Sequence, residues 1–253
     1  MHDFASSGSF YGQTRLRGEF MKPKCTLLFA LILVFSNMYG GMYGSCTAAE
    51  NEDNPFRHAF PEPVILIDAG HGGIDGGTSY GGILEKDINL EIGRRLYMIL
   101  RSHGYRTILN RTGDYALSDD NRWSRSRSRH LRDLAQRKQL SEELPSEIVV
   151  SLHVNWGRNK AKRGPIVLHQ NEGRSVLLAS SIQNALNSLN GTSSLPQHGK
   201  PFYLLKHVDC PAVIVETGFL SNAKDRAMLT SKRGQQKIAE ALYGGILAYF
   251  TAI

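Results

Sequence analysis

Four residues of types that bind metals or move protons stand at the ends of apolar segments: His71, Glu85, His153 and Glu216. His71 follows a short apolar run in a glycine-rich loop, and Glu85 closes that loop. His153 and Glu216 each end a later apolar run. Two histidines and one glutamate leave a fourth position open around a metal ion, which is typical of a catalytic zinc site rather than a structural one. The remaining glutamate, Glu216, would then be a general base, and this set of groups is suited to amide hydrolysis.

Each of these residues also has a purely structural interpretation. A histidine at the end of a strand, such as His71, is as often structural as it is a ligand. A glutamate in the first turn of a helix is favoured by the helix dipole, so Glu85 alone is weak support. A carboxylate at the end of a buried strand needs a partner or a function, because burying a charge is costly. Glu216 could therefore be a metal ligand, a general base or one half of an ion pair.

The segments that position these residues alternate between strand-like and helix-like patterns, which predicts a single α/β domain. The strand-like runs are 64–67, which Asp68 ends, and 105–109, 147–153, 165–169 and 212–215. The helical patterns start at Glu85 and cover 175–189, 222–228 and 232–250. Pro165 cannot donate a ladder hydrogen bond, which favours a place near the sheet edge for its strand. Because parallel strand ends meet at one edge of a sheet, His71 and His153 are expected to face one crevice.

Three further residues are candidates for substrate contacts: Asn155, Arg111 and His198. Asn155 follows His153 closely, and His198 lies in the polar loop 190–201. Arg111 lies in a turn, where it could hold a substrate carboxylate or pair with Asp114. Pairing with Asp114 is the more ordinary outcome.

Residues 1–49 have the order of a secretory signal, since basic residues precede the apolar run 26–35 and small residues follow it. The run is short for a membrane span, so the segment is interpreted as a signal peptide or an N-terminal membrane anchor. Either predicts export, with membrane contact only through this segment. Residues 50–63 are polar and contain prolines, which indicates a linker, and 64–253 are predicted to form the catalytic domain.

The 253-residue chain is moderately basic, with a formal charge of +7, which favours anionic partners. Its arginines are densest in 122–138, where arginine and serine alternate. Such alternation occurs in RNA-binding proteins, but the segment has no aromatic residue for base stacking apart from Trp123 and continues into a helical pattern. We therefore predict an exposed helix entrance, no nucleic-acid partner, and an anionic wall polymer or acidic protein surface if the segment binds anything. The three cysteines form neither a disulfide framework nor a metal-binding spacing.

Four motifs together resemble those of the zinc-dependent N-acetylmuramoyl-L-alanine amidases, which cut bacterial peptidoglycan. The motifs are 64–73, Glu85, 151–155 and 215–222, and the resemblance covers 64–250. It implies Zn²⁺ on His71, Glu85 and His153, with Glu216 as the catalytic acid/base. It also implies a mixed, mostly parallel sheet flanked by helices on both faces, and cleavage between the lactyl group of muramic acid and L-alanine.

Within that family, the chain is similar to the germination-specific amidases of the spore cortex. The similarity lies in the short N-terminal apolar segment, the absence of separate wall-binding repeats and the basic insert after Leu117. It implies removal of whole peptides so that a companion deacetylase can form muramic-δ-lactam, and some members depend on a partner lipoprotein. The chain departs from the family pattern where Ala69 stands in place of proline and where an Ala-Asn pair is missing after Arg137.

Three alternatives stay open at this point. The chain could be a vegetative autolysin amidase, or a different zinc hydrolase, such as a peptidase or a deacetylase, with the same ligands. It could also be a non-catalytic wall-binding or regulatory protein, which would be expected to have lost Glu216.

Overall fold

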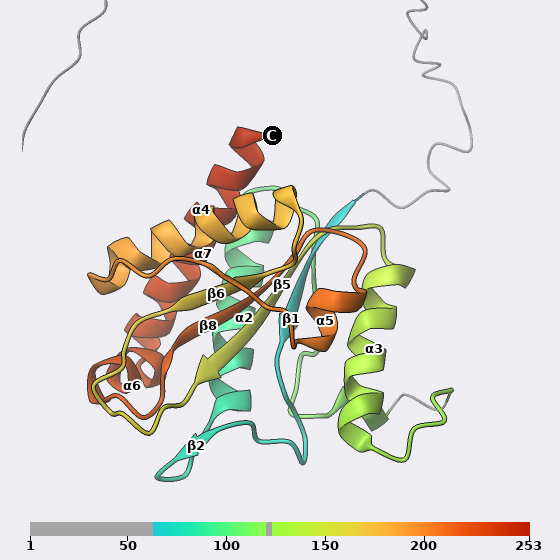
Figure 1. Cartoon of the computed structure of the whole chain (residues 1–253), viewed down its shortest axis with the longest axis horizontal. Helices are drawn as coiled ribbons and strands as arrows, with labels where there is room; N and C mark the ends of the chain where they lie inside the picture. The colour runs from blue at the N-terminus through green and yellow to red at the C-terminus, as the bar shows by residue number, and fades with distance from the viewer. Residues whose placement is uncertain (1–62, 120–122) are drawn as a thin grey trace, which may run out of the picture. The chain divides into compact units, whose positions relative to one another are not determined.

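Apolar runs build a six-stranded sheet with the strand order β4-β1-β5-β8-β6-β7. The computed structural model describes residues 63–119 and 123–253, which lie in one compact unit (Figure 1). Four neighbouring strands run parallel: β4 (Thr107–Leu109), β1 (Val64–Ala69), β5 (Ser146–Asn155) and β8 (Ala212–Phe219). Beyond them, β6 (Ile166–His169) is antiparallel to β8, and the edge strand β7 (Gln197–His198) is parallel to β6. A separate hairpin, β2 (Ser79–Tyr80) and β3 (Ile83–Leu84), lies in the loop after β1.

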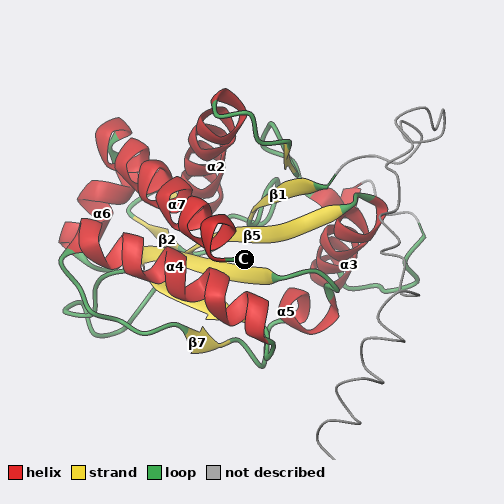
Figure 2. Cartoon of the chain, turned by 90° about the horizontal axis from the view of Figure 1, so that it is seen from above, coloured by secondary structure: helices red, strands yellow, loops and turns green. Residues whose placement is uncertain are grey.

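Helices cover both faces of this sheet (Figures 1 and 2). One face packs against α2 (Glu85–Ser102), α4 (Gly173–Asn190) and α7 (Lys232–Ala252). The other face carries the smaller core beneath α3 (Arg129–Glu143) and α5 (Tyr203–His207). Two short elements complete the described chain, the 3₁₀ helix η1 (Leu117–Asp119) and α6 (Ala223–Thr230).

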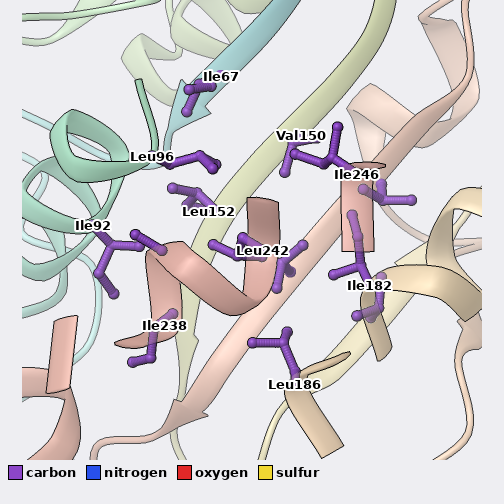
Figure 3. Close-up of a cluster of buried hydrophobic side chains, with 14 of the residues drawn as sticks. Ile67, Ile92, Leu96, Val150, Leu152, Ile182, Leu186, Ile238, Leu242 and Ile246 are labelled. Carbon is purple, nitrogen blue, oxygen red and sulfur yellow. The ribbon is translucent and has the colours of Figure 1, made fainter. Parts of the chain in front are cut away.

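The larger core forms because alternate strand residues and the apolar stripes of three helices point to the same side. Leu152 of β5, Leu96 of α2 and Leu242 of α7 lie together in it, and each is fully buried (Figure 3). The next residues along the strands, such as Leu66, face α3 and α5 instead. Because side chains alternate between the two faces along a strand, a side chain near the end of a strand can be assigned to a face from its position relative to these core residues.

The structure confirms the predicted fold class, a single α/β domain with a mixed, mostly parallel sheet and helices on both faces. Several details differ from prediction. The strands β5 and β8 do not end at His153 and Glu216 but continue to Asn155 and Phe219. Asp68 does not end its strand, because β1 continues to Ala69 and the carboxylate is buried within the sheet. The helix α5 and the edge strand β7 were not predicted. They are only five and two residues long, which is too short to show a periodic hydrophobic pattern.

The interpretations of 1–49 and of the linker up to residue 62 lie outside the described residues. Within 63–119 and 123–253, no helix is both long and apolar enough to cross a membrane. The first strand of the described chain, β1, begins at Val64.

Candidate active site

His71, Glu85 and His153 converge at the carboxyl end of the parallel strands. One ligand atom of each lies within 4.8 Å of the others. The Oε1 atom of Glu85 lies 3.2 Å from Nε2 of His71 and 3.0 Å from Nδ1 of His153. In the part of the chain that the structure describes, no other three His, Cys, Asp or Glu side chains come together in this way. This group can hold one metal ion.

Glu85 is the first residue of α2 and is held as a carboxylate by the groups around it. Backbone N–H groups of Thr78 and Val154 donate to its two oxygens, at 2.8 and 2.9 Å. Burial raises the pKa of Glu85, but hydrogen bonds and charge from His153 and His71 outweigh burial and hold the pKa well below its usual range. The side chain is therefore negatively charged and aimed at both imidazoles.

His71 adopts a left-handed backbone conformation, with φ of 61°, which is uncommon for a residue other than glycine. This conformation turns its ring toward Glu85, while Nδ1 lies 2.9 Å from Oδ2 of Asp75. Burial lowers the pKa of His71, but the hydrogen bonds and charges of Glu85 and Asp75 outweigh burial and raise it to about 9. Because a metal-bound histidine is commonly oriented by a carboxylate on its other nitrogen, Asp75 supports a ligand role for His71.

Two glycines leave the space that the three ligands occupy. A Cβ atom on Gly70 would lie 2.4 Å from Cε1 of His153. A Cβ atom on Gly77 would lie 2.5 Å from Oε2 of Glu85. The loop is therefore free of side chains where the ligands need room.

Glu216 lies beside this group because it is the register partner of His153 in the parallel pair β5–β8. Register partners point to the same face of a sheet, here the face of α3 and α5. The Oε2 atom of Glu216 is buried and has no hydrogen-bond partner among the described residues. Burial raises the pKa of Glu216, and the charge of Glu85 adds to this against the opposing charges of His153 and His71. A carboxylate of this kind, with a free oxygen and a raised pKa, is suited to taking up a proton.

Comparison with known families decides what this site belongs to. The sequence profile of the family described as N-acetylmuramoyl-L-alanine amidase matches residues 65–248, which include all four residues. The chain belongs to this family. It is therefore an amidase that acts on peptidoglycan, as the resemblance predicted.

Individual relatives agree with the family match. The amidase is 33% identical to the germination-specific N-acetylmuramoyl-L-alanine amidase of Bacillus subtilis over 74% of this chain and 80% of that protein. Its structure is similar to that of the CwlD amidase from Clostridioides difficile, solved in complex with the GerS lipoprotein. The TM-score is 0.71 and the identity 32%, over 76% of this chain and all of the other. The catalytic domain of CwlV from Bacillus (Paenibacillus) polymyxa is similar as well, with a TM-score of 0.64 and 27% identity over 76% of this chain and 100% of that one.

A buried polar network supports the His71 loop of the amidase. Arg137 of α3 forms ion pairs with Asp68 and Asp133, and its guanidinium also donates to the carbonyl of His71 at 2.9 Å. The Ser151 hydroxyl donates to Asp68 at 2.6 Å. Burial raises the pKa of Asp68, but the charge of Arg137 and these hydrogen bonds outweigh burial and lower it. Sequence reasoning placed Arg137 in an exposed basic segment, yet only 3% of its side chain is exposed.

Arg111 does not reach the site as a substrate contact. Its guanidinium is buried and donates to four backbone carbonyls, those of Ala69, Gly70, Lys86 and Gly113. The expected hydrogen-bonded pair with Asp114 is also replaced, because Asp114 accepts from Nζ of Lys86 at 2.7 Å. Arg111 therefore anchors the loop after β1, which explains why an arginine at a strand end need not face a ligand.

The two other predicted contact residues differ in position. Asn155 lies near the site at the end of β5, where its side chain accepts from the N–H of Trp156 at 2.8 Å. His198 lies in β7 beside His169, whose register partner in β8 is Val213. Glu216 instead pairs in register with Ile166 at the other end of β6. Because β6 is antiparallel to β8, the end of β6 that carries His169 points away from the site, and His198 is not brought to it.

A cavity of about 510 Å³ opens from the metal-binding group onto the face of α3 and α5. His71 and His153 line it together with residues of both helices. The cavity is of the size that accommodates small ligands in proteins. We call it the α3–α5 groove.

Proposed function

We propose that the amidase is zinc-dependent, with Zn²⁺ held by His71, Glu85 and His153. The donor set of two imidazoles and one carboxylate is typical of catalytic zinc sites. The room left by Gly70 and Gly77 and the carboxylate on the second nitrogen of His71 fit the same assignment. Bound zinc would supply Lewis acidity and favour ionisation of a water molecule near neutral pH.

Glu216 carries the proposal, because its buried Oε2 has no other partner among the described residues. It would accept a proton from the attacking water and then deliver this proton to the nitrogen of the leaving amine. The raised pKa of Glu216 brings its proton affinity closer to that needed for both steps. A non-catalytic wall-binding protein would have no need for this residue.

The bond that would be cleaved is the amide between the lactyl group of N-acetylmuramic acid and L-alanine. The family description names these two parts of the substrate. The products would be a glycan strand with a free lactyl carboxylate and a peptide that begins with L-alanine.

We further propose a role in maturation of the spore cortex, where peptide removal would precede the action of a companion deacetylase that forms muramic-δ-lactam. The similarity to a germination-specific amidase and to the CwlD amidase supports this role over that of a vegetative autolysin. Because the similar CwlD structure contains the GerS lipoprotein, a partner lipoprotein is part of the proposal. The apolar run in 26–35 supports export, either as a cleaved signal peptide or as a membrane anchor. In both cases the enzyme would meet its substrate outside the cytoplasm.

Mass spectrometry of muropeptides tests these proposals directly. The purified protein is incubated with cortex peptidoglycan, once after chelation and once after addition of zinc. Release of intact peptides beginning with L-alanine only in the zinc sample is the expected result. Equal release after complete removal of the metal would contradict zinc dependence, and release of other fragments would contradict the assigned bond.

A further inference from the structure

The α3–α5 groove leads away from the metal-binding group toward one lysine and two histidines. His130 of α3 and Lys206 and His207 of α5 line it, and all three are exposed. None of the described residues that line the groove is acidic. Lys206 therefore places a positive charge in the groove lining, and no lining residue carries a negative charge.

Lys206 is available for a ligand. Within 63–119 and 123–253 it forms no ion pair and no side-chain hydrogen bond, and it is exposed on the five-residue helix α5. The neighbouring Lys138 of α3, in contrast, already pairs with Glu142. The His207 ring packs on Tyr203, with 4.4 Å between the ring centroids, so its position beside Lys206 is fixed.

The rest of the groove is apolar. Its remaining walls are formed mainly by aliphatic and aromatic side chains of α3, β8 and the segment before α5, among them Leu134, Ile214 and Phe202. The lining offers no Asn, Gln, Asp or Glu, so its polar side-chain groups are those of the histidines, Lys206 and Tyr203. A peptide with small apolar side chains and carboxylates would meet both kinds of surface.

We propose that the α3–α5 groove binds the peptide that the amidase releases, and that Lys206, flanked by His130 and His207, binds a free carboxylate of this peptide. This inference rests on the proposed function, since it assigns the leaving group of that reaction to one side of the site. It makes Lys206 a specificity-determining residue. Amidation of the recognised carboxylate would weaken binding, because an amide carries no charge to pair with the ammonium group.

The test compares two peptides, L-alanyl-D-glutamate with its γ-carboxyl group capped as an N-methylamide, and the same peptide with the glutamate α-carboxylate also converted to an amide. Calorimetry measures their affinity for the zinc-loaded full-length protein, and hydrolysis of peptidoglycan is followed in parallel. The variant is Lys206→Met, which keeps the length of the side chain and removes its charge. The matched control is Lys237→Met, because Lys237 is also exposed but lies on α7, which packs on the opposite face of the sheet.

The wild type and Lys237→Met are expected to bind the acid peptide roughly ten-fold more tightly than the amide, as one charge-assisted hydrogen bond would give. Lys206→Met is expected to lose this preference, and to raise KM for peptidoglycan with free carboxylates while kcat stays the same. Equal binding of both peptides by the wild type, or an unchanged preference in Lys206→Met, would overturn the inference while hydrolysis by the wild type leaves the proposed function standing. Absence of any peptide release by the wild type would overturn the proposed function and this inference with it.

Discussion

Arg137 and Asp68 form a buried ion pair that joins α3 to the carboxyl end of β1. Only 3% of the arginine side chain and 4% of the aspartate side chain are exposed. Through the same guanidinium, Arg137 also holds the carbonyl of His71, so the pair links the stability of the domain to the position of a proposed ligand.

Arg137→Met is expected to destabilise the fold, because Asp68 would remain buried without its cation. Removing one partner of a buried pair typically costs about 3–5 kcal/mol, and denaturant unfolding measures the loss. Lys138→Met on the same helix removes an exposed pair with Glu142 and is expected to change stability much less. Adding Asp68→Asn to Arg137→Met should restore part of the loss, and a further loss instead would contradict this account.

Glu216→Gln is expected to abolish turnover while zinc remains bound. The amide keeps the size of the side chain but can no longer accept a proton, and loss of a general base lowers kcat by roughly 10²–10⁴-fold. Peptide release and zinc content are measured on the same sample. Retention of most of the activity would exclude Glu216 as the base, whereas loss of zinc would indicate that it is a ligand.

Gly77→Ala is expected to weaken zinc binding, because its Cβ would meet the Glu85 carboxylate and the His71 ring. Gly81→Ala is the matched control: Gly77 and Gly81 have similar left-handed φ angles of 66° and 56°, but no atom lies within 4 Å of a Cβ at Gly81. Both variants bear the same backbone strain, and only the first displaces ligands. Competition with a chromogenic chelator measures the affinities, and equal losses in the two variants would mean that backbone strain alone is responsible.

The metal-free protein is expected to lose stability as the pH rises from about 6.5 to about 9. The pKa of His71 is raised to about 9 in the folded state, so the folded protein holds this proton more tightly than the unfolded chain does. The stabilisation is complete below the unfolded pKa and disappears as the pH passes the folded value, with a total of up to about 3 kcal/mol.

Unfolding in the presence of a chelator at several pH values measures this dependence, and His71→Gln should flatten it. Zinc binding should follow the opposite trend, since a ligand histidine must lose its proton and the affinity therefore increases with pH over the same interval. A stability profile that rises through this interval in the metal-free wild type would contradict the assignment.

The sequence was sufficient to predict the fold class and the convergence of His71, Glu85, His153 and Glu216. Strand ends in a parallel sheet meet at one edge, so three apolar runs that each end in such a residue already imply a common site. Successive side chains of a strand point to opposite faces of the sheet, and this alternation places Glu216 and His153 on one face. Their register in the pair β5–β8 confirms it.

The supporting residues were not predictable in the same way. Arg137 is buried, whereas Arg129 of the same helix is exposed and Arg132 is partly buried, and nothing in the local sequence distinguishes the three. Asp68 was interpreted as the end of its strand. A carboxylate inside an apolar strand instead indicates a buried cation from elsewhere in the chain, which here is Arg137. The error for Arg111 has the same origin, because its partners are backbone carbonyls, which no side-chain pattern reveals.

The α3–α5 groove has a rim of exposed side chains on both sides, including Leu131 and Phe202. A groove of this kind can bind the middle of a polymer chain, so the enzyme does not require a free chain end. If the substrate is a cross-linked wall polymer, this geometry would let the enzyme attach anywhere along a strand. The rate would then depend on the exposed surface of the polymer and on the chemistry of each peptide, and hardly at all on how many chain ends the wall contains.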